Sequence, residues 1–203
     1  MRHDNFIVTD RRFVRRSRGR LPHWQLDEST YFVTFRLRDS LPKHIALALF
    51  REREQMMRMT MTTAERAEVD RLFGLKLDSH LDEGHGSCIF RDEANAAIVA
   101  GALQFFDRVR YQLHAWCVMP NHVHVIFYLK HGADLEWVLH SWKSYTAHEI
   151  GRGVIWQREY CDRIVRDARD FWSTRNYVLN NPFKAGLRNW KWVGVGSSIP
   201  DLG

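Results

Sequence analysis

The segment from Tyr111 to Leu129 constrains the fold of this chain more than any other. Residues 111–118 (YQLHAWCV) and 122–129 (HVHVIFYL) are rich in β-branched and aromatic residues, and only Met119-Pro120-Asn121 separates them. Such runs are typical of strands, and proline with asparagine is typical of a tight turn. The sequence therefore predicts two strands that pair as an antiparallel hairpin.

The second strand of this hairpin places two histidines on one face. Side chains alternate between the faces of a strand, so His122, His124 and Ile126 lie on the same side. The opposite face is apolar and carries Val123, Val125 and Phe127. Two neutral imidazoles side by side can hold one divalent cation. The alternative is a histidine pair that only packs or faces solvent, and the spacing alone leaves both interpretations open.

The rest of the chain alternates between strand and helix patterns. Strands are predicted at 31–38 (YFVTFRLR), 155–156 and 160–166 (YCDRIVR). Helices are predicted at 43–59, 63–77, 92–109, 134–150 and 167–181, and a polar loop at 78–87. This order indicates an α+β fold with a small, mainly antiparallel central sheet and helices packed on it.

Composition narrows the class of protein. The 203 residues are enough for one sizeable domain with extensions, and a hydrophobic fraction of 45% supports a packed core. No apolar run of transmembrane length and no secretory signal is recognised, so no membrane association is expected. Cys88, Cys117 and Cys161 form no C-x-x-C pair, which favours a reducing cytoplasm over a disulfide framework.

Positive charge is concentrated at the N-terminus. Residues 1–20 contain seven arginines and two aspartates, which gives +5 of the net charge of +6. Arginine clusters suit phosphate groups and are typical of nucleic-acid binding. A solvated basic tail that aids solubility is the alternative.

A late helix supplies the second chemical feature. Tyr177 and Asn181 are four residues apart, so they share a helical face, and Pro182 places Asn181 at the helix end. A tyrosine hydroxyl has a reference pKa of about 10 and needs activation by a cation and a proton acceptor. Two imidazoles, an amide oxygen and a tyrosine can form a centre for attack on a phosphodiester. The alternative for Tyr177 is an ordinary residue of an amphipathic helix.

Two motifs carry a resemblance to a known family. Residues 115–127 (AWCVMPNHVHVIF) and 177–187 (YVLNNPFKAGL) resemble the single-tyrosine HUH transposases, and most of all the REP-associated tyrosine transposases. The segments YFVTFRLR, LDEGHGSCIF and YCDRIVRD are also similar, so the resemblance covers roughly residues 20–188. Relatives often have histidine where this chain has Arg163.

The resemblance implies a ferredoxin-like α+β fold and a DNA strand transferase of bacterial, nucleoid-associated type. Such enzymes cut and rejoin single-stranded DNA, often at hairpins or palindromic repeats, through a covalent 5′-phosphotyrosine. It also implies a Mg²⁺ or Mn²⁺ ion held by His122, His124 and Asn181, with Tyr177 as nucleophile. The expected partners are single-stranded or hairpin DNA, bound by a monomer or homodimer.

The same resemblance divides the chain into a basic N-terminal arm (1–30), an HUH-type transposase domain (31–188) and a C-terminal tail (189–203). Candidate DNA contacts follow from basic and aromatic character. They are Arg18, Arg20, Trp24, Lys143 and Arg166. Trp24 is equally expected as a core anchor, and Lys143 as part of a solvated helix face.

Two other functions compete with strand transfer. One is a non-catalytic DNA-binding regulator of palindromic repeats, which would need neither the histidine pair nor Tyr177. The other is a metal-dependent hydrolase that uses water, but the chain has no H-E-x-x-H pattern. Within the strand transferase hypothesis, Tyr160 is a rival nucleophile, although it has no amide at helical spacing.

Overall fold

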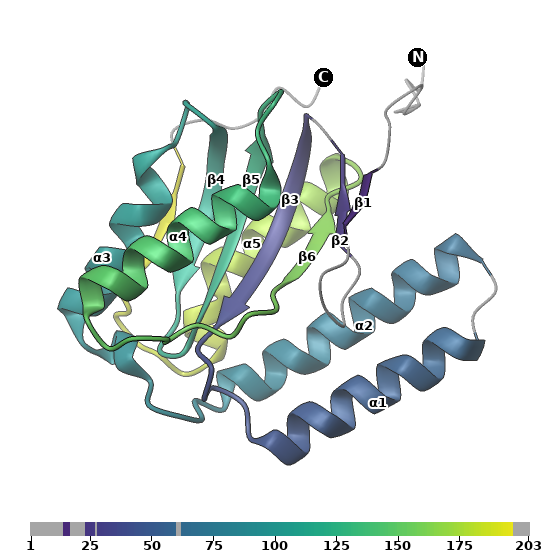
Figure 1. Cartoon of the computed structure of the whole chain (residues 1–203), viewed down its shortest axis with the longest axis horizontal. Coiled ribbons are helices and arrows are strands. Elements are labelled where there is room, and N and C mark those ends of the chain that lie inside the picture. Colours follow the sequence, from purple (N-terminus) through teal and green to yellow (C-terminus); the bar gives the residue numbers. More distant parts are fainter. Residues whose placement is uncertain (1–13, 17–22, 27, 60–61, 197–203) are drawn as a thin grey trace.

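The computed structural model describes residues 14–16, 23–26, 28–59 and 62–196, and for 14–16, 23–25 and 63 it describes the backbone alone (Figure 1). The strands are β1 Val14–Arg16, β2 His23–Gln25, β3 Ser29–Arg36, β4 Tyr111–Val118, β5 His122–Leu129, β6 Cys161–Ile164 and β7 Val193–Val195. The helices are α1 Lys43–Met59, α2 Thr63–Asp82, α3 Glu93–Phe105, α4 Leu135–Ile150 and α5 Ala168–Lys184, with a 3₁₀ turn at Ile89–Arg91.

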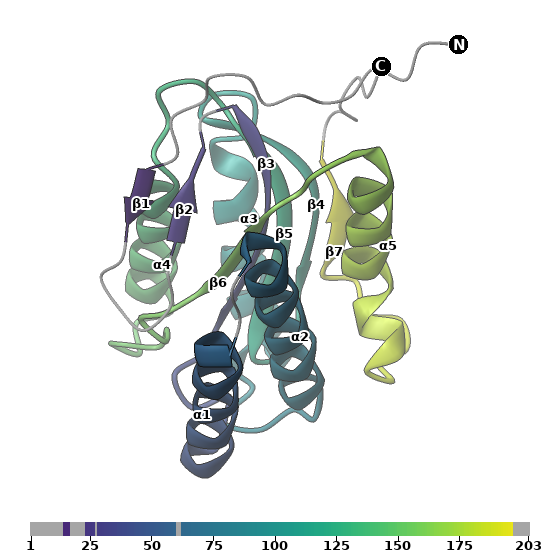
Figure 2. The ribbon, with the colours of Figure 1, turned by 90° about the vertical axis from the view of Figure 1, so that its right-hand side faces the viewer.

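Five strands form one sheet with β5 at its centre. The order is β6-β3-β5-β4-β7, and every neighbouring pair is antiparallel. Helices α3 and α4 cover one face of the sheet, while α5 covers the other (Figures 1 and 2). The predicted α+β class, with a ferredoxin-like central antiparallel sheet covered by helices, is confirmed, and so is the hairpin of β4 and β5.

The face covered by α3 and α4 is the main apolar core. It takes Val123, Val125 and Phe127 from β5 and packs them against Trp142 of α4 and the aromatic residues of neighbouring strands. Trp142 donates its indole N–H to the hydroxyl of Tyr111 at 3.0 Å, so even its polar atom is satisfied. This core fixes the register of β5 and thereby the direction in which its histidines point.

The other face is smaller and partly polar. Ala115, Cys117 and Ile126 of the sheet contact Phe171 and Val178 of α5. Asp167 caps this helix by accepting from the backbone N–H of Asp170 at 2.8 Å. The short side chains of β4 leave α5 close to the sheet.

Helix α5 runs past the boundary predicted from the sequence. It continues through Pro182 to Lys184, so the prediction that Asn181 ends the helix was wrong. A proline removes only one backbone donor, and it lies in the last turn. The N–H of Ala185 still reaches the carbonyl of Asn181 at 3.0 Å, and Asn181 stays helical and buried.

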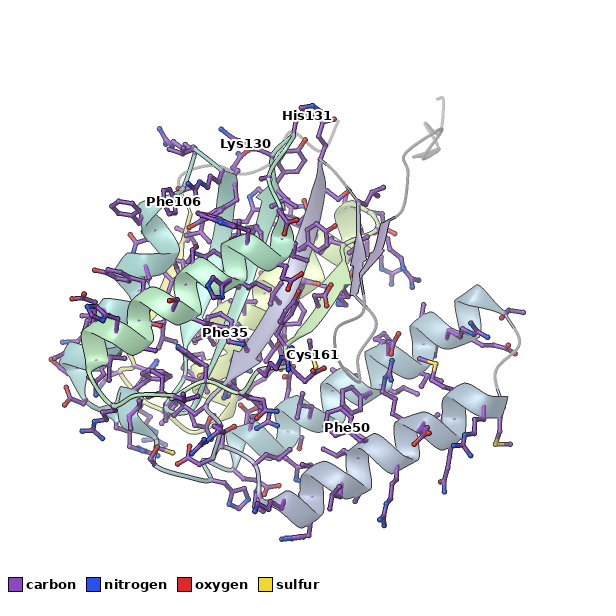
Figure 3. The ribbon with its side chains drawn as sticks, in the orientation of Figure 1. Phe35, Phe50, Phe106, Lys130, His131 and Cys161 are labelled. Carbon is purple, nitrogen blue, oxygen red and sulfur yellow. The ribbon has the colours of Figure 1, made fainter. Side chains whose placement is uncertain are left out.

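Helices α1 and α2 form a hairpin beside the β6 edge of the sheet (Figures 1 and 2). Leu49 of α1 packs with Phe73, Leu77 and Leu81 of α2, and this cluster also receives Cys161 of β6. Phe50 lies on the α2 side of α1, and Cys161 lies between the sheet and the hairpin (Figure 3). The hairpin is thus attached to the sheet by apolar contacts.

The prediction of a loop over residues 78–87 was wrong in its first half. Helix α2 continues to Asp82 because Leu77 and Leu81, four residues apart, bury one more helical turn. The chain turns only at Gly84, where φ is +73°, a conformation that glycine adopts without strain. Asp78 and Asp82 therefore lie on a helix next to the sheet.

The sheet extends into the segment predicted as a C-terminal tail. Strand β7 pairs with β4 and places Gly194 opposite Trp116. A Cβ atom at Gly194 would lie 2.7 Å from the indole of Trp116, so only glycine fits there. Among the described residues, no helix is long and apolar enough to cross a membrane.

Candidate active site

The centre of the sheet carries two buried histidines. His122 and His124 of β5 point to the α5 face, and both side chains are 0% exposed. Their Nε2 atoms lie 2.9 Å apart. Asn121 Oδ1 lies 2.7 Å from His122 Nδ1, and Thr34 Oγ1 lies 2.9 Å from His124 Nδ1. Each imidazole is therefore held from behind, with its other nitrogen directed at its neighbour.

Both imidazoles are neutral at neutral pH. Burial lowers the pKa of His124 to about 3 and, with the neighbouring His124, lowers the pKa of His122 well below its usual value. Because Asn121 donates its own amide N–H to the carbonyl of His85, its oxygen faces His122 and accepts from Nδ1. Nε2 of His122 then presents a lone pair, as a metal ligand must.

Helix α5 brings Tyr177 over this pair and carries Asn181 one turn later on the same helical face. The ring of Tyr177 lies edge-on to His124, with centroids 5.5 Å apart. Asn181 is 0% exposed, and neither its Oδ1 nor its Nδ2 has a hydrogen-bond partner among the described residues. Burial raises the pKa of Tyr177, and the amide of Asn181 opposes that rise, which places the amide near the tyrosine hydroxyl. Buried amides are normally satisfied, so the two polar atoms of this one are available to a ligand.

Two carboxylates reach the site from α2. The hydroxyl of Tyr177 donates to Oδ2 of Asp78 at 2.8 Å. Oδ1 of Asp82, one turn later, lies 3.8 Å from Nε2 of His122 and has no hydrogen-bond partner among the described residues. Because His122 is neutral, the latter contact is not an ion pair. The sequence prediction missed both aspartates, although their spacing with Leu77 and Leu81 was a usable signal.

Burial changes the protonation of these groups. It raises the pKa of Asp78 to about 7 against the opposing effect of the Tyr177 hydroxyl, and raises that of Asp82 to about 6. Burial and the charge of Asp78 also raise the pKa of Tyr177 above its usual value. The resting site therefore holds a protonated phenol beside an aspartate that titrates near neutral pH.

The donor set fits an octahedral divalent ion. Two adjacent ligands of such an ion, each bound at about 2.1 Å, lie about 3.0 Å apart. The two imidazole Nε2 atoms lie 2.9 Å apart, close to that value. Within the part of the chain that the structure describes, no group of three or more His, Cys, Asp or Glu side chains is arranged to hold a metal. The buried amide of Asn181 and the Oδ1 atom of Asp82, neither with a hydrogen-bond partner among the described residues, are the further oxygen donors of this region.

Arg163 lies on the same side of the sheet as Tyr177. Its guanidinium bonds to Asp170 at 2.8 Å and to the hydroxyl of Thr174, both on α5, and lies 5.4 Å from the ring centre of Phe32. Phe32 in turn meets Tyr177 edge-on at 5.9 Å. Arg163 thus ties β6 to the helix that carries Tyr177.

The candidate DNA contacts are scattered. Arg18 and Arg20 lie outside the described residues, and for Trp24 the structure describes only its backbone position in β2. Arg166 is exposed at the start of α5. Lys143 lies on α4, across the sheet from the histidines, and donates to the carbonyls of Gln157 and Arg158 at 2.6 and 2.9 Å. Lys143 is therefore not brought to the candidate site.

Two further residues refine the prediction. Tyr160 packs with the core on the α3 and α4 side, so it does not meet the histidine pair. Lys184, which no motif singled out, lies two turns after Tyr177, with its ammonium 4.9 Å from the centre of that ring.

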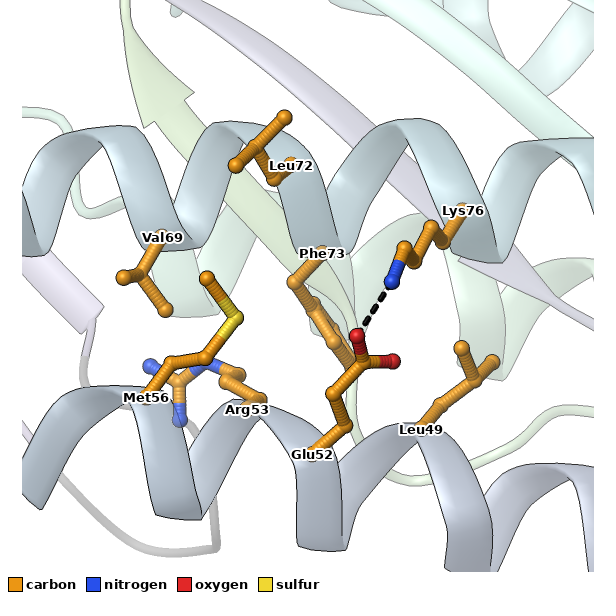
Figure 4. A pocket seen from close by; sticks show the side chains of 8 residues that line it. All are labelled: Leu49, Glu52, Arg53, Met56, Val69, Leu72, Phe73 and Lys76. Carbon is orange, nitrogen blue, oxygen red and sulfur yellow. Dashed lines mark hydrogen bonds and ion pairs between the residues drawn. The ribbon is translucent and has the colours of Figure 1, made fainter.

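A separate small cavity of about 70 Å³ lies between α1 and α2, lined by Leu49, Glu52, Arg53, Met56, Val69, Leu72, Phe73 and Lys76 (Figure 4). It is too small for a nucleotide.

Comparison with known proteins finds similarity to transposases over the part of the chain that contains this site. Residues 88–181 match the family described as Transposase IS200 like, and this span contains the histidine pair, Tyr177 and Asn181. A REP-associated tyrosine transposase of Escherichia coli (strain K12) is 30% identical over 93 residues, 44% of this chain and 52% of the relative. This chain therefore matches about half the length of that relative.

A solved structure supports the same assignment at the level of the fold. It is a REP-associated tyrosine transposase bound to a REP hairpin, with a TM-score of 0.54 and 17% identity, covering 84% of this chain and 79% of that chain. The resemblance predicted from the motifs is confirmed: this chain is similar in sequence and in fold to REP-associated tyrosine transposases.

Proposed function

We propose that this protein cleaves and rejoins single-stranded DNA through a covalent 5′-phosphotyrosine at Tyr177. The observation that carries the proposal is the grouping of a tyrosine hydroxyl, two buried neutral imidazoles and a buried, unsatisfied amide on one face of the sheet. A protein that only binds DNA has no need to bury such polar groups, which cost stability when they are not satisfied.

His122, His124 and Asn181 are the residues that would hold Mg²⁺ or Mn²⁺. A bound divalent ion supplies charge neutralisation and orientation of the scissile phosphate. The imidazoles contribute lone pairs because burial keeps them neutral. Thr34 and Asn121 fix their orientation from behind, as supporting residues of metal ligands commonly do.

Tyr177 performs the covalent step. Its oxygen attacks the phosphorus, the bond from phosphorus to the 3′-oxygen breaks, and the 5′-phosphate stays on the tyrosine. A 3′-hydroxyl is released. Rejoining is the reverse, with a 3′-hydroxyl attacking the phosphotyrosine. Because the pKa of Tyr177 is raised, its proton must be removed during attack.

Hairpin DNA is the substrate that we propose, since the structural neighbour is bound to a REP hairpin. The N-terminal arginines, including Arg18 and Arg20, supply the charge for phosphate contacts. Arg166 and Lys184 add exposed positive charge near the tyrosine helix. Trp24 is proposed as a stacking residue for an unpaired base.

The test is a search for the covalent adduct. Single-stranded oligonucleotides with a hairpin, labelled at the 5′ or the 3′ end, are incubated with protein and Mg²⁺ or Mn²⁺ and analysed under denaturing conditions. We expect protein joined only to the fragment downstream of the cut. Tyr177→Phe should abolish the adduct and reduce cleavage more than about 10³-fold, while hairpin binding persists.

Tyr160→Phe is the matched control, because it also removes one hydroxyl but on the opposite side of the sheet. It should cleave like the wild type. An adduct that survives in Tyr177→Phe would move the nucleophile elsewhere. Tight hairpin binding without any adduct in the wild type would favour the non-catalytic regulator instead.

A further inference from the structure

We propose that Asp78 is the general base for the nucleophile, so that helix α2 belongs to the catalytic site. This inference rests on the proposed function of Tyr177. The two residues are 99 positions apart, yet the hydroxyl of Tyr177 donates to Oδ2 of Asp78 at 2.8 Å. A base must lie within about 2.6–3.2 Å of the oxygen whose proton it takes, and this one does.

The surroundings leave few other acceptors for that proton. His122 and His124 face each other through their Nε2 atoms, and their Nδ1 atoms lie against Asn121 and Thr34. Asp82 is directed at His122 rather than at Tyr177. Asp78 is 5% exposed, so bulk water has little access to the bond. Among the described side chains, Asp78 is the one hydrogen-bonded to the nucleophilic oxygen.

The proton balance is complete. In cleavage the O–H bond of Tyr177 breaks and its proton moves to Asp78, while the bond from oxygen to phosphorus forms. The 3′-oxygen leaves with its electron pair and takes a proton from solvent. In rejoining, the 3′-hydroxyl gives a proton to solvent and attacks phosphorus. The tyrosine oxygen then leaves and regains its proton from Asp78.

The electrostatic setting supports this role. Burial raises the pKa of Asp78 to about 7, whereas Tyr177 and Arg163 oppose that rise and Asp82 adds to it. Cys161, on the neighbouring strand, also faces this carboxylate. A base works best with a pKa near the operating pH, because it is both available and strong enough. An unburied aspartate would be a much weaker base.

Packing holds the carboxylate in place. Leu77 and Leu81, on either side of Asp78, are buried in the cluster shared by α1, α2 and Cys161. The helical hairpin thus presents Asp78 to α5 from a rigid support. A purely structural alternative remains testable: the bond to Tyr177 joins α2 to α5 and does nothing else.

The experiment compares Asp78→Asn with wild type in single-turnover cleavage of the labelled hairpin oligonucleotide between pH 5.5 and 9. Asparagine keeps an oxygen that accepts from Tyr177 but is not a base. We expect cleavage about 10²–10⁴-fold slower with unchanged hairpin affinity. The wild-type rate should rise with pH through about 7, where Asp78 ionises, and this rise should vanish in the variant.

Asp70→Asn is the matched control on the same helix, and it should keep the wild-type rate and pH profile. Asp78→Glu restores a carboxylate and should recover part of the rate, which a structural role would not require. Wild-type cleavage by Asp78→Asn, with its adduct on Tyr177, overturns the role of Asp78 alone. A wild type that forms no adduct overturns the proposed function and this inference together.

Discussion

The two faces of the central sheet show opposite uses of burial. Toward α3 and α4, β5 presents Val123, Val125 and Phe127 to a continuous apolar core. Toward α5 and α2, the same strand presents His122 and His124, which are equally buried but polar. Apolar burial stabilises a fold, whereas polar burial costs free energy unless every group is satisfied. One face therefore maintains the strand in register, and the other uses that rigidity to hold reactive groups.

Buried polar atoms without a hydrogen-bond partner among the described residues occur on both faces. Arg110, which stacks on Phe106 and Trp137 beside the apolar core, contributes one, and the polar face holds more. Asn181 and Asp82 both contain buried polar atoms without a partner among the described residues. On the apolar face the indole of Trp142 donates to the hydroxyl of Tyr111, which in turn donates to the carbonyl of Leu103. Functional sites often retain buried, unsatisfied polar groups that a core selected only for stability would not contain. The contrast predicts that changes on the polar face alter chemistry and changes on the apolar face alter stability.

The largest effect is expected from removing one histidine. His122→Ala and His124→Ala should each reduce cleavage about 10³-fold or more, because one imidazole alone does not hold the ion. EDTA should stop wild-type cleavage, and Mg²⁺ or Mn²⁺ should restore it. Both variants should remain folded, with a loss of about 1–3 kcal/mol, since the apolar face keeps the sheet together. Cleavage and circular dichroism are measured in parallel.

His114→Ala is the matched control for these variants. His114 is also a buried histidine, on the neighbouring strand β4, but it packs against Phe171, with ring centres 5.0 Å apart. It should retain metal-dependent cleavage. Robust cleavage in chelator by either of the two β5 variants would remove the metal from the mechanism and leave the histidine pair as packing.

On the apolar face, Trp142→Ala should lower stability by about 3–5 kcal/mol. The ring of Trp142 contacts those of Tyr111 and Phe127, with centroids 5.2 and 5.3 Å apart, and its loss leaves a large cavity. Urea unfolding measures the change, and Trp142→Phe, which keeps most of the volume, should lose less. The fraction still folded should cleave normally. A cleavage defect without a loss of stability would contradict the separation of the two faces.

These contrasts also explain what the sequence could predict. The hairpin of β4 and β5 was predicted with its observed boundaries because strong alternation and a proline-containing turn act locally. The position of the two histidines on one face was predicted for the same reason, because side chains two residues apart on a strand always point to the same face. Helix α1 was predicted with its observed boundaries as well. A feature that depends on the residues of a single helix or strand can therefore be predicted from the sequence.

The missed features depend on distant partners. Asp78 becomes buried only because α2 docks beside a tyrosine that lies 99 residues later in the chain. The end of α2 was predicted too early because Gly84 and Gly86 dominate the local pattern, while the burial of Leu81 decides the outcome. Strand β7 has three residues and pairs only because β4 offers an edge. Contacts between residues that are far apart in the chain leave no periodic pattern in the sequence, so they could not be predicted from it.

A smaller effect concerns pH and stability. In the folded protein the pKa of Asp78 is raised to about 7 from its usual 3.8. The folded state thus retains a proton that the unfolded state loses, so the free energy of unfolding should fall as pH rises from about 4 to 7. Three pKa units correspond to about 4 kcal/mol as an upper bound. Urea unfolding of metal-free protein should show this slope.

Asp78→Asn should remove that part of the slope and be more stable than wild type at pH 8, with little difference at pH 4. Asp70→Asn, whose carboxylate lies about two turns before Asp78 and pairs with Arg53 of α1, should keep the slope. Equal slopes in wild type and Asp78→Asn would show that Asp78 is not held protonated by burial. The buried polar groups of the site would then lower the free energy of unfolding by less than proposed.

The smallest effect is expected from the N-terminal arm. The arm belongs to neither face of the sheet, so its removal tests whether DNA binding can be weakened without changing catalysis or stability. Deletion of residues 1–20 removes a net charge of +5, from seven arginines and two aspartates. Each phosphate that the arm no longer neutralises should flatten the slope of log affinity against log salt concentration by about 0.7 for single-stranded DNA. Binding should weaken most at low salt, while the cleavage rate of bound hairpin stays unchanged.

A full-length variant with all seven arginines replaced by glutamine keeps the chain length and should match the deletion. A salt slope identical to that of the wild type in both variants would show that the arm only solubilises the protein, and that the DNA is held by the sheet and α5 themselves.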